Sequence, residues 1–229
     1  GVPKIQRIIA YEGYDDEEVL RIAACLEEHF YHPIATAVVK KAEDEGIEHE
    51  EMHGKLTHVA SKGIVSSIDG KRVVIGSLEL LEDEKMIISN EQKAVIEEYS
   101  QKYNLLYLSY DGKLIAIFLI DTPLRGEAIA LLKELKEKGK QIVLLTGDTQ
   151  KRTETICSLI PFDRVYTQVK PEEKHQVIEQ LQEEGHHVLM IGDGINDSAA
   201  LSLANVGIVM AGASDIARQA SDILFLNEQ

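Results

Sequence analysis

The chain is poor in positive charge, in cysteine and in long apolar segments, and each shortage excludes a class of protein. It has 24 Lys and Arg against 39 Asp and Glu, giving a net charge of -15. This argues against nucleic-acid binding, because phosphate backbones require a basic surface. It also disfavours docking on an anionic membrane surface. The longest apolar run, Leu114–Ile120, is far below the ~18 residues that a membrane helix needs.

Cysteine is equally scarce. Cys25 and Cys157 are the only two, and they form no Cys-x-x-Cys pair, so we expect reduced thiols and an intracellular setting. We expect no signal peptide, and the start at Gly1 without Met suggests a fragment of a longer protein. What is present is ordinary: 44% of the 229 residues are hydrophobic and 28% are charged. That length suits two domains of roughly 100 residues each.

The first half of the sequence predicts two helices followed by a twisted antiparallel sheet. An acidic run at residues 15–18 precedes helical apolar spacing, and Pro33 should end this helix and begin the next. Asp-Gly pairs at residues 69–70 and 111–112 lie between apolar runs and indicate two hairpins. A helix over about 91–102 is expected between the hairpins.

The second half alternates apolar strands with amphipathic helices, which predicts a Rossmann-like parallel sheet with helices on both faces. We expect the first domain to cover 1–112 and the second 113–229, with the first few residues able to join the second domain. Strands are expected at 114–120, 141–146, 188–192, 205–209 and 222–226, and helices near 124–138, 150–159, 171–184, 196–204 and 214–220.

Two polar loops follow predicted buried strands of this second sheet. The run Gly-Asp-Gly-Ile-Asn-Asp occupies residues 192–197, and Thr146-Gly147-Asp148 follows another apolar strand. Ligands of such sheets bind at the carboxyl ends of the strands. Asp193 and Asp197, supported by Asn196, are therefore predicted to hold Mg²⁺, which prefers oxygen ligands. The alternative is an ordinary loop, since Gly, Asp and Asn are common there.

A phosphoryl group is the predicted partner of this metal. Thr146 and the Gly147 amide can donate to phosphoryl oxygens, with Asp148 beside them, and Lys174 can add positive charge against the developing negative charge. For a single lysine, a solvated position on a helix is the alternative interpretation.

These motifs resemble those of the haloacid-dehalogenase superfamily as P-type ATPases carry them. Residues 121–128 resemble the segment that opens the second part of their phosphorylation domain. Glu27 and His32, followed by Pro33, resemble the adenine-binding signature of the heavy-metal-transporting branch. Residues 61–63 and 76–77 are similar to that branch's two glycine loops. The resemblance covers essentially the whole chain, as a nucleotide-binding domain followed by most of a phosphorylation domain.

The resemblance implies an adenosine site formed by Glu27, His32, Gly63 and Gly76. His32 could present its ring to adenine, Glu27 could accept the exocyclic amino hydrogens, and the glycines would let the backbone approach the nucleotide. A packed or solvated histidine at a helix corner is the alternative for His32.

The sequence departs from the family pattern at several points. The Asp-Lys-Thr-Gly-Thr segment with the phosphorylated Asp is absent from the chain and is expected just before Gly1. Ser61 and Ser77 replace a usual Gly and Asn, and Tyr31 replaces an acidic residue. We therefore expect a recognisable nucleotide site of altered affinity and no autophosphorylation.

The resemblance implies a cytoplasmic ATP-binding and phosphoryl-transfer unit of a membrane pump for heavy-metal cations, working through an aspartyl phosphate. ATP and Mg²⁺ are the expected cofactors. The expected partners are the membrane-embedded transport domain and the actuator domain of the same parent chain, with a metallochaperone as a further candidate. Domain closure, with a hinge near 111–114 and the N-terminal strand, would join the two sites. The alternatives are a free-standing Mg²⁺-dependent phosphatase of the superfamily and a non-catalytic ATP-binding regulatory module.

One further motif has the spacing of a different kind of site, a zinc site. Residues 49–53 read His-Glu-Glu-Met-His, which has the spacing of a His-Glu-x-x-His zinc helix. The flanking residues offer no long helix with an apolar face, and His58, a conceivable third ligand, falls in the next predicted strand. A solvated acidic connector, with at most adventitious metal binding, is the better interpretation.

Overall fold

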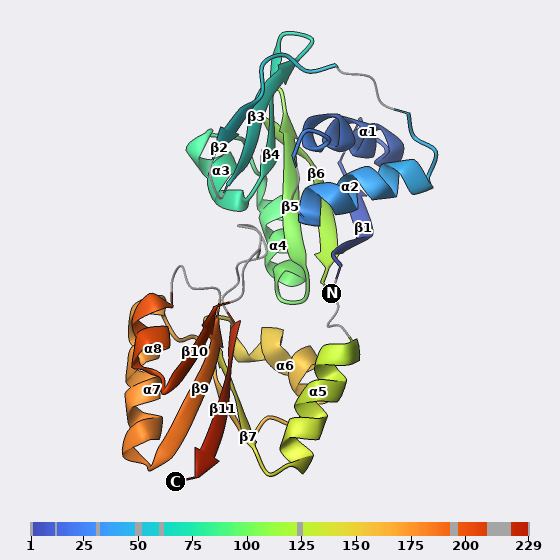
Figure 1. Cartoon of the computed structure of the whole chain (residues 1–229). Coiled ribbons are helices and arrows are strands. Elements are labelled where there is room, and N and C mark those ends of the chain that lie inside the picture. Colours follow the sequence, from blue (N-terminus) through green and yellow to red (C-terminus); the bar gives the residue numbers. More distant parts are fainter. Residues whose placement is uncertain are drawn as a thin grey trace. The chain divides into compact units, whose positions relative to one another are not determined.

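The computed structural model describes residues 2–11, 13–30, 33–48, 52–59, 62–122, 126–192, 197–209 and 221–228. These residues form two compact units, each built on its own sheet (Figure 1). The first unit runs through strand β6 (Lys113–Asp121) and the second begins with helix α5 (Gly126–Glu137). Among the described helices, none has both the length and the apolar character that crossing a membrane requires.

The sheet of the first unit has six antiparallel strands in the order β1-β6-β5-β4-β3-β2. Both predicted hairpins are confirmed, because residues 69–70 join β3 to β4 and residues 111–112 join β5 to β6. Asp69 and Asp111 each have a φ of 51°, as the first position of a type I′ hairpin turn requires. The strands are β1 (Lys4–Ala10), β2 (Thr57–Val59), β3 (Gly63–Ile68), β4 (Lys71–Gly76), β5 (Asn104–Tyr110) and β6 (Lys113–Asp121).

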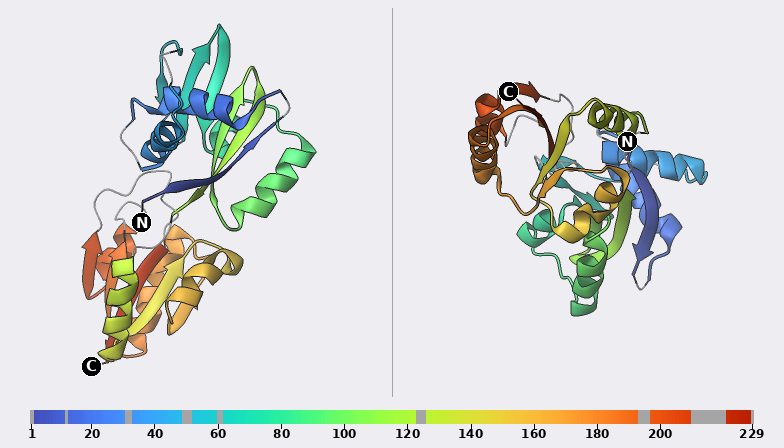
Figure 2. Two further views of the ribbon diagram at one scale, coloured as in Figure 1. Left: turned by 90° about the vertical axis from the view of Figure 1, so that its right-hand side faces the viewer. Right: turned by 90° about the horizontal axis from the view of Figure 1, so that it is seen from below.

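Helices cover both faces of this sheet (Figures 1 and 2). Helices α1 (Asp16–Glu27) and α2 (Pro33–Asp44) pack on one face, and α3 (Leu78–Asp83) and α4 (Asn90–Ser100) pack on the other. The acidic start of α1 is confirmed: Asp15 accepts a hydrogen bond from the Glu18 amide at 2.8 Å, which satisfies one free amide of the first turn.

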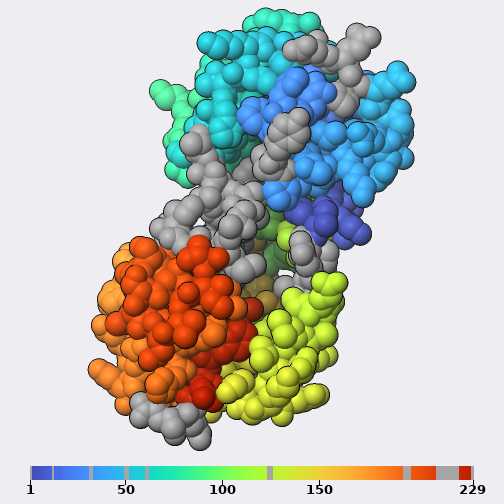
Figure 3. Space-filling view, viewed as in Figure 1, coloured from blue at the N-terminus to red at the C-terminus, as the bar shows by residue number. Residues whose placement is uncertain are grey.

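The second unit has a five-stranded sheet in the order β10-β9-β11-β7-β8. Helices α7 and α8 pack on one face, and α5 and α6 pack on the other. In the space-filling view, dark red β11 is visible between the orange surface of α7 and α8 and the yellow-green α5 (Figure 3). The elements are α5 (Gly126–Glu137), β7 (Gln141–Thr146), α6 (Gln150–Leu159), β8 (Arg164–Tyr166), the short 3₁₀ turn η1 (Pro171–Glu173), α7 (Lys174–Glu183), β9 (His186–Gly192), α8 (Ser198–Leu203), β10 (Val206–Val209) and β11 (Ser221–Glu228).

Two predictions about the second sheet are wrong. The strand predicted at 114–120 is β6, which pairs with β1 and β5 in the first sheet. Its continuous apolar run suggested a parallel sheet, but helices cover both faces of the antiparallel sheet, so β6 is buried on both faces as well. The two compact units therefore separate after β6 rather than near 111–114, and β1 lies in the first unit.

The other correction concerns the strand predicted at 222–226. This strand, β11, runs antiparallel to both of its neighbours, β7 and β9. The remaining neighbours, β7 with β8 and β9 with β10, pair in parallel as expected. The second sheet is therefore mixed, with its antiparallel strand in the centre. The helix predicted over 214–220 lies outside the described residues.

Candidate functional site

The Thr146-Gly147-Asp148 loop begins where β7 ends, as predicted. Thr146 is fully buried, and its hydroxyl oxygen accepts a hydrogen bond from the Asp148 amide at 3.1 Å. The Thr146 carbonyl accepts a second hydrogen bond from the Val169 amide at 3.0 Å. Gly147 is exposed and Asp148 is half-buried. These two hydrogen bonds hold the loop in place, while Gly147 remains exposed and accessible to a ligand.

Lys174 is buried rather than solvated, although it is the first residue of α7. Its ammonium group donates to Asp197 Oδ1 at 2.8 Å and to Asp222 Oδ2 at 2.5 Å. Burial alone would lower the pKa of Lys174, but the hydrogen bonds to the two carboxylates outweigh it and raise the pKa. Lys174 is therefore a fixed positive charge, and the interpretation as a solvated helix lysine is excluded.

Asp222 is a member of this cluster that the sequence analysis missed. It is the second residue of β11 and pairs in register with Leu145 of β7. Because β11 is antiparallel, its start lies at the sheet edge where β7 and β9 end. Nothing in the run Ser-Asp-Ile-Leu marks this position. Burial, together with a hydrogen bond to Asp197 that opposes ionisation, raises the pKa of Asp222 to about 7.

When Asp197 and Asp222 are both ionised, their two negative charges exceed the single positive charge of Lys174. Among the described residues, Asp197 Oδ2 is buried without a hydrogen-bond partner. The backbone of Gly192 passes so close that a Cβ there would lie 2.9 Å from Asp222 Oδ1 and 3.0 Å from Asp197 Oδ2. A second cation would satisfy the free oxygen, and carboxylate oxygens suit Mg²⁺. The other predicted metal residues, Asp193 and Asn196, lie outside the described residues.

Three of the predicted nucleotide residues are described, and they lie in the first unit. Glu27, the last residue of α1, is 2% exposed, which is unusual for a carboxylate at a helix end. Gly63 and Gly76 face each other across β3 and β4. His32 lies outside the described residues, as do the departures at Tyr31 and Ser61.

The close packing of β3 against β4 supplies a structural reason for both glycines. A Cβ on Gly63 would lie 2.2 Å from the Ile75 carbonyl oxygen, and one on Gly76 would lie 2.1 Å from the Lys62 carbonyl oxygen. Their φ angles of 144° and 158° also favour glycine. Ser77, the other departure, caps α3 by accepting from the Leu80 amide at 3.2 Å.

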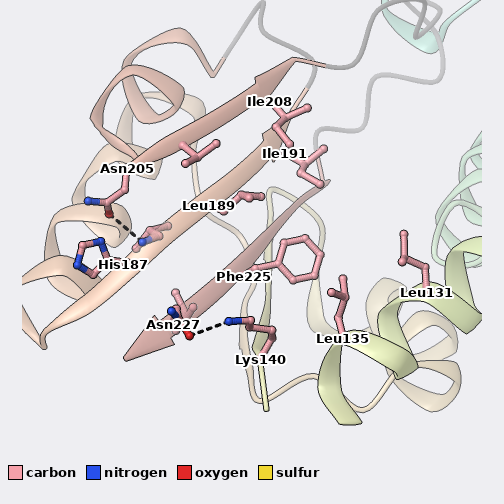
Figure 4. Close-up of a pocket in the computed structure, with 13 residues that line it drawn as sticks. Leu131, Leu135, Lys140, His187, Leu189, Ile191, Asn205, Ile208, Phe225 and Asn227 are labelled. Atoms are coloured by element: carbon pink, nitrogen blue, oxygen red, sulfur yellow. Dashed lines mark hydrogen bonds between the residues drawn. The ribbon is translucent and has the colours of Figure 1, made fainter. Parts of the chain in front are cut away.

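An apolar groove of about 410 Å³ lies along the second sheet, on the face shared with α5 (Figure 4). Leu131 and Leu135 of α5 face Leu189 and Phe225 across it. Among the described residues that line the groove there is no carboxylate. The groove therefore lacks the oxygen ligands that Mg²⁺ prefers.

A family model described as a haloacid dehalogenase-like hydrolase matches residues 1–205. The chain belongs to this family. Its curated relatives are heavy-metal P-type ATPases. It is 34% identical to a silver exporting P-type ATPase of Salmonella typhimurium, over 99% of this chain and 27% of that protein. It is also 34% identical to a zinc-exporting P-type ATPase of Mycobacterium marinum, over 100% of this chain and 32% of that protein. The chain thus spans about a third or less of the length of these relatives.

Solved structures give the same result for the fold. One of them is the catalytic domain of the CPx-ATPase CopB-B, in a structure that concerns its conformational changes upon nucleotide binding. That domain superposes on this chain with a TM-score of 0.66 and is 28% identical to it. The match covers 94% of this chain and 77% of that one. This likeness confirms the predicted pair of folds, an α+β unit with an antiparallel sheet and a haloacid-dehalogenase-like α/β unit.

Proposed function

We propose that this chain is the ATP-binding and phosphoryl-transfer part of a heavy-metal-transporting P-type ATPase. The observation that carries the proposal is the buried Lys174, held by Asp197 and Asp222 at the sheet edge where the Thr146 loop begins. A fixed positive charge and an exposed backbone at Gly147, both at this sheet edge, are features that stabilise a phosphoryl group. The relatives support the assignment to metal pumps. In the parent protein, this chain is then the cytoplasmic catalytic part, joined to a membrane-embedded transport domain and an actuator domain.

In this proposal each unit carries its own set of binding residues. Glu27 and His32, with Gly63 and Gly76, bind the adenosine of ATP in the first unit. Thr146, Gly147, Asp148 and Lys174 receive the phosphoryl group in the second. Asp193 and Asp197, with Asn196 in support, would hold Mg²⁺, which neutralises phosphate charge when bound.

The chain's own residues prepare this site. Lys174 pairs with both buried acidic side chains and keeps Asp197 in position for a cation. The Thr146 hydroxyl fixes the Asp148 amide, which leaves the Gly147 amide open to a phosphoryl oxygen.

A free-standing phosphatase is less well supported. It requires an accessible carboxylate nucleophile, whereas the side chains of Asp197 and Asp222 are 0% and 1% exposed and both are paired with Lys174. The chain also lacks the Asp-Lys-Thr-Gly-Thr segment. We therefore expect no self-phosphorylation from ATP and no turnover of p-nitrophenyl phosphate. Turnover of p-nitrophenyl phosphate by the chain would favour the phosphatase instead.

Calorimetric titration with ATP in excess Mg²⁺ tests the nucleotide half. The chain should bind ATP at one site, and His32→Ala should weaken binding by at least about tenfold, since a stacked and hydrogen-bonded base contact contributes about 1–3 kcal/mol. His187→Ala, an exposed histidine of the second unit, is the matched control. Undiminished binding by His32→Ala would refute the assignment of the adenosine site.

The metal half is tested separately, by titration with Mg²⁺ alone. Asp197→Asn should abolish the heat of binding, while Asp163→Asn, a carboxylate elsewhere in the second unit, should leave it unchanged. Equal Mg²⁺ binding by Asp197→Asn would place the metal elsewhere.

A further inference from the structure

Three metal-ligating side chains meet at the C-terminal end of α1, within the first unit. Glu28 and His29 follow the last turn of the helix, and His53 comes from the segment that precedes β2. One donor atom from each lies within 4.8 Å of the other two. The His29 and His53 rings are 5.2 Å apart in an edge-to-face arrangement. The fold thus gives His53 partners that the His-Glu-x-x-His spacing does not contain.

His53 is held in place from both sides. The Met52 amide donates to Cys25 Sγ of α1 at 3.4 Å, and the Gly54 amide donates to the Ser67 carbonyl of β3 at 2.8 Å. These contacts attach the short segment to a helix and a strand of the same unit. His53 is therefore preorganised beside α1, so binding a metal there would require little ordering of the backbone.

The protonation of the His53 ring follows from its hydrogen bond. Nδ1 lies 2.8 Å from the Gly54 carbonyl oxygen. A carbonyl can only accept, so Nδ1 carries the hydrogen and Nε2 carries the lone pair of the neutral ring. Histidine ligands of metals commonly show this arrangement, which fixes the ring orientation and strengthens the donor nitrogen.

The remaining distances suit a small divalent cation. Bonds of about 2.1 Å in a tetrahedron place ligand atoms about 3.4 Å apart, and His29 Nε2 lies 3.3 Å from Glu28 Oε1. The His29 side chain is 45% exposed, so it can turn to close the larger gaps. The last turn of α1 has no basic residue, which leaves the negative end of the helix dipole for a cation.

We propose that Glu28, His29 and His53 form a binding site for a divalent transition metal of the zinc class, with water completing the coordination. Two imidazole nitrogens and one carboxylate oxygen are a donor set that suits Zn²⁺. Mg²⁺ prefers all-oxygen sites, so this site is chemically distinct from the one at Asp197. The inference does not rest on the proposed function, because it concerns other residues and another metal.

Calorimetric titration of the metal-free chain with Zn²⁺, in excess Mg²⁺, tests the proposal. We expect one Zn²⁺ per chain, bound at least about tenfold more weakly by His29→Ala and by His53→Ala. His49→Ala and His58→Ala are matched controls that should bind as the unaltered chain does. Loss of binding in His49→Ala with full binding in His29→Ala would place the metal on the His-Glu-x-x-His segment and overturn the proposal. Equal binding by all four variants would overturn it too.

Cobalt gives a second measurement that reports geometry. Co²⁺ at this site should show the intense visible absorption of four-coordinate cobalt, and Glu28→Gln should reduce it. The weak absorption of six-coordinate cobalt would contradict the site. Should His53→Ala fail to fold, as judged by circular dichroism, His29→Ala and Glu28→Gln remain decisive, because both side chains lie at the surface end of the helix.

Discussion

Replacing Asp222 by asparagine should remove a large part of the pH dependence of stability in the second unit. The pKa of Asp222 is raised from 3.8 to about 7, chiefly by burial. Between these pH values the folded chain holds a proton that the unfolded chain has lost, so stability falls as the pH rises through this window. The difference corresponds to at most about 4 kcal/mol, at about 1.4 kcal/mol for each pKa unit.

Lys174 does not contribute to this slope. Its pKa is raised above 10.5, so the stability that its charge provides is fully present below 10.5 and is lost only as the pH rises through the higher, folded-state value. Asparagine has the size of aspartic acid and does not titrate. We therefore expect the stability difference between the unaltered chain and Asp222→Asn to change by about 2–4 kcal/mol between pH 4.5 and pH 8.

The assay must report on the second unit alone, because a chain of two units need not unfold in one step. Fluorescence is unsuitable, since the chain has no Trp and Tyr166 is the only tyrosine after residue 123. Pulsed hydrogen exchange in urea, read by mass spectrometry on peptides from β9 and β11, gives the free energy of unfolding at each pH. Parallel pH profiles for the two proteins, or a difference that changes in the opposite direction, would refute the reasoning.

Four further predictions concern single side chains. Lys174→Met should destabilise the second unit by about 3–5 kcal/mol, because it leaves two buried carboxylates without their cation; the exposed Lys151→Met is the control, and equal urea midpoints would contradict the prediction. Gly76→Ala should cost more than about 2 kcal/mol in the first unit, because its Cβ would meet a backbone carbonyl 2.1 Å away. Gly126→Ala is the control for this variant: a Cβ at Gly126 would meet no atom within 4 Å, so the protein should unfold at an unchanged or higher urea concentration. His32→Ala should weaken ATP binding, and His29→Ala should weaken Zn²⁺ binding, in the titrations described above.

Local chemistry allowed much of the fold to be predicted. The Asp-Gly turns require positive φ and reveal the two hairpins, and Pro33 marks the start of α2 because its ring fixes φ and lacks an amide hydrogen. The helices of the second half follow from their apolar spacing. These features depend on a few neighbouring residues, so the sequence alone contains the necessary information.

Sheet membership depends on distant pairing and was predicted less well. An apolar run such as 114–120 is equally suited to a strand of either sheet, because both sheets are covered by helices on two faces. The direction of β11 is set by its pairing with β7 and β9. No pattern in the sequence of β11 itself indicates this direction.

The candidate site also combines residues that local motifs predict with residues that only the pairing of distant strands brings together. Thr146 and Lys174 were predicted from motifs, and the structure places them at one sheet edge with Asp197. Asp222 joins them only because β11 is antiparallel. Likewise, the contact of His53 with Glu28 and His29 requires the segment before β2 to cross the end of α1, which spacing along the chain cannot indicate.

The central position of β11 also has a consequence for the order of folding. The last described strand of the chain joins β9 to β7, so neither neighbour can complete its hydrogen bonding until residues 221–228 are available. During synthesis the first unit can fold while the second remains an incomplete pair of two-stranded sheets. The second unit should then form in a single late step, with exposed strand edges until that moment. Ribosome-bound chains that end before residue 221 should accordingly be sensitive to protease after β6 and resistant before it.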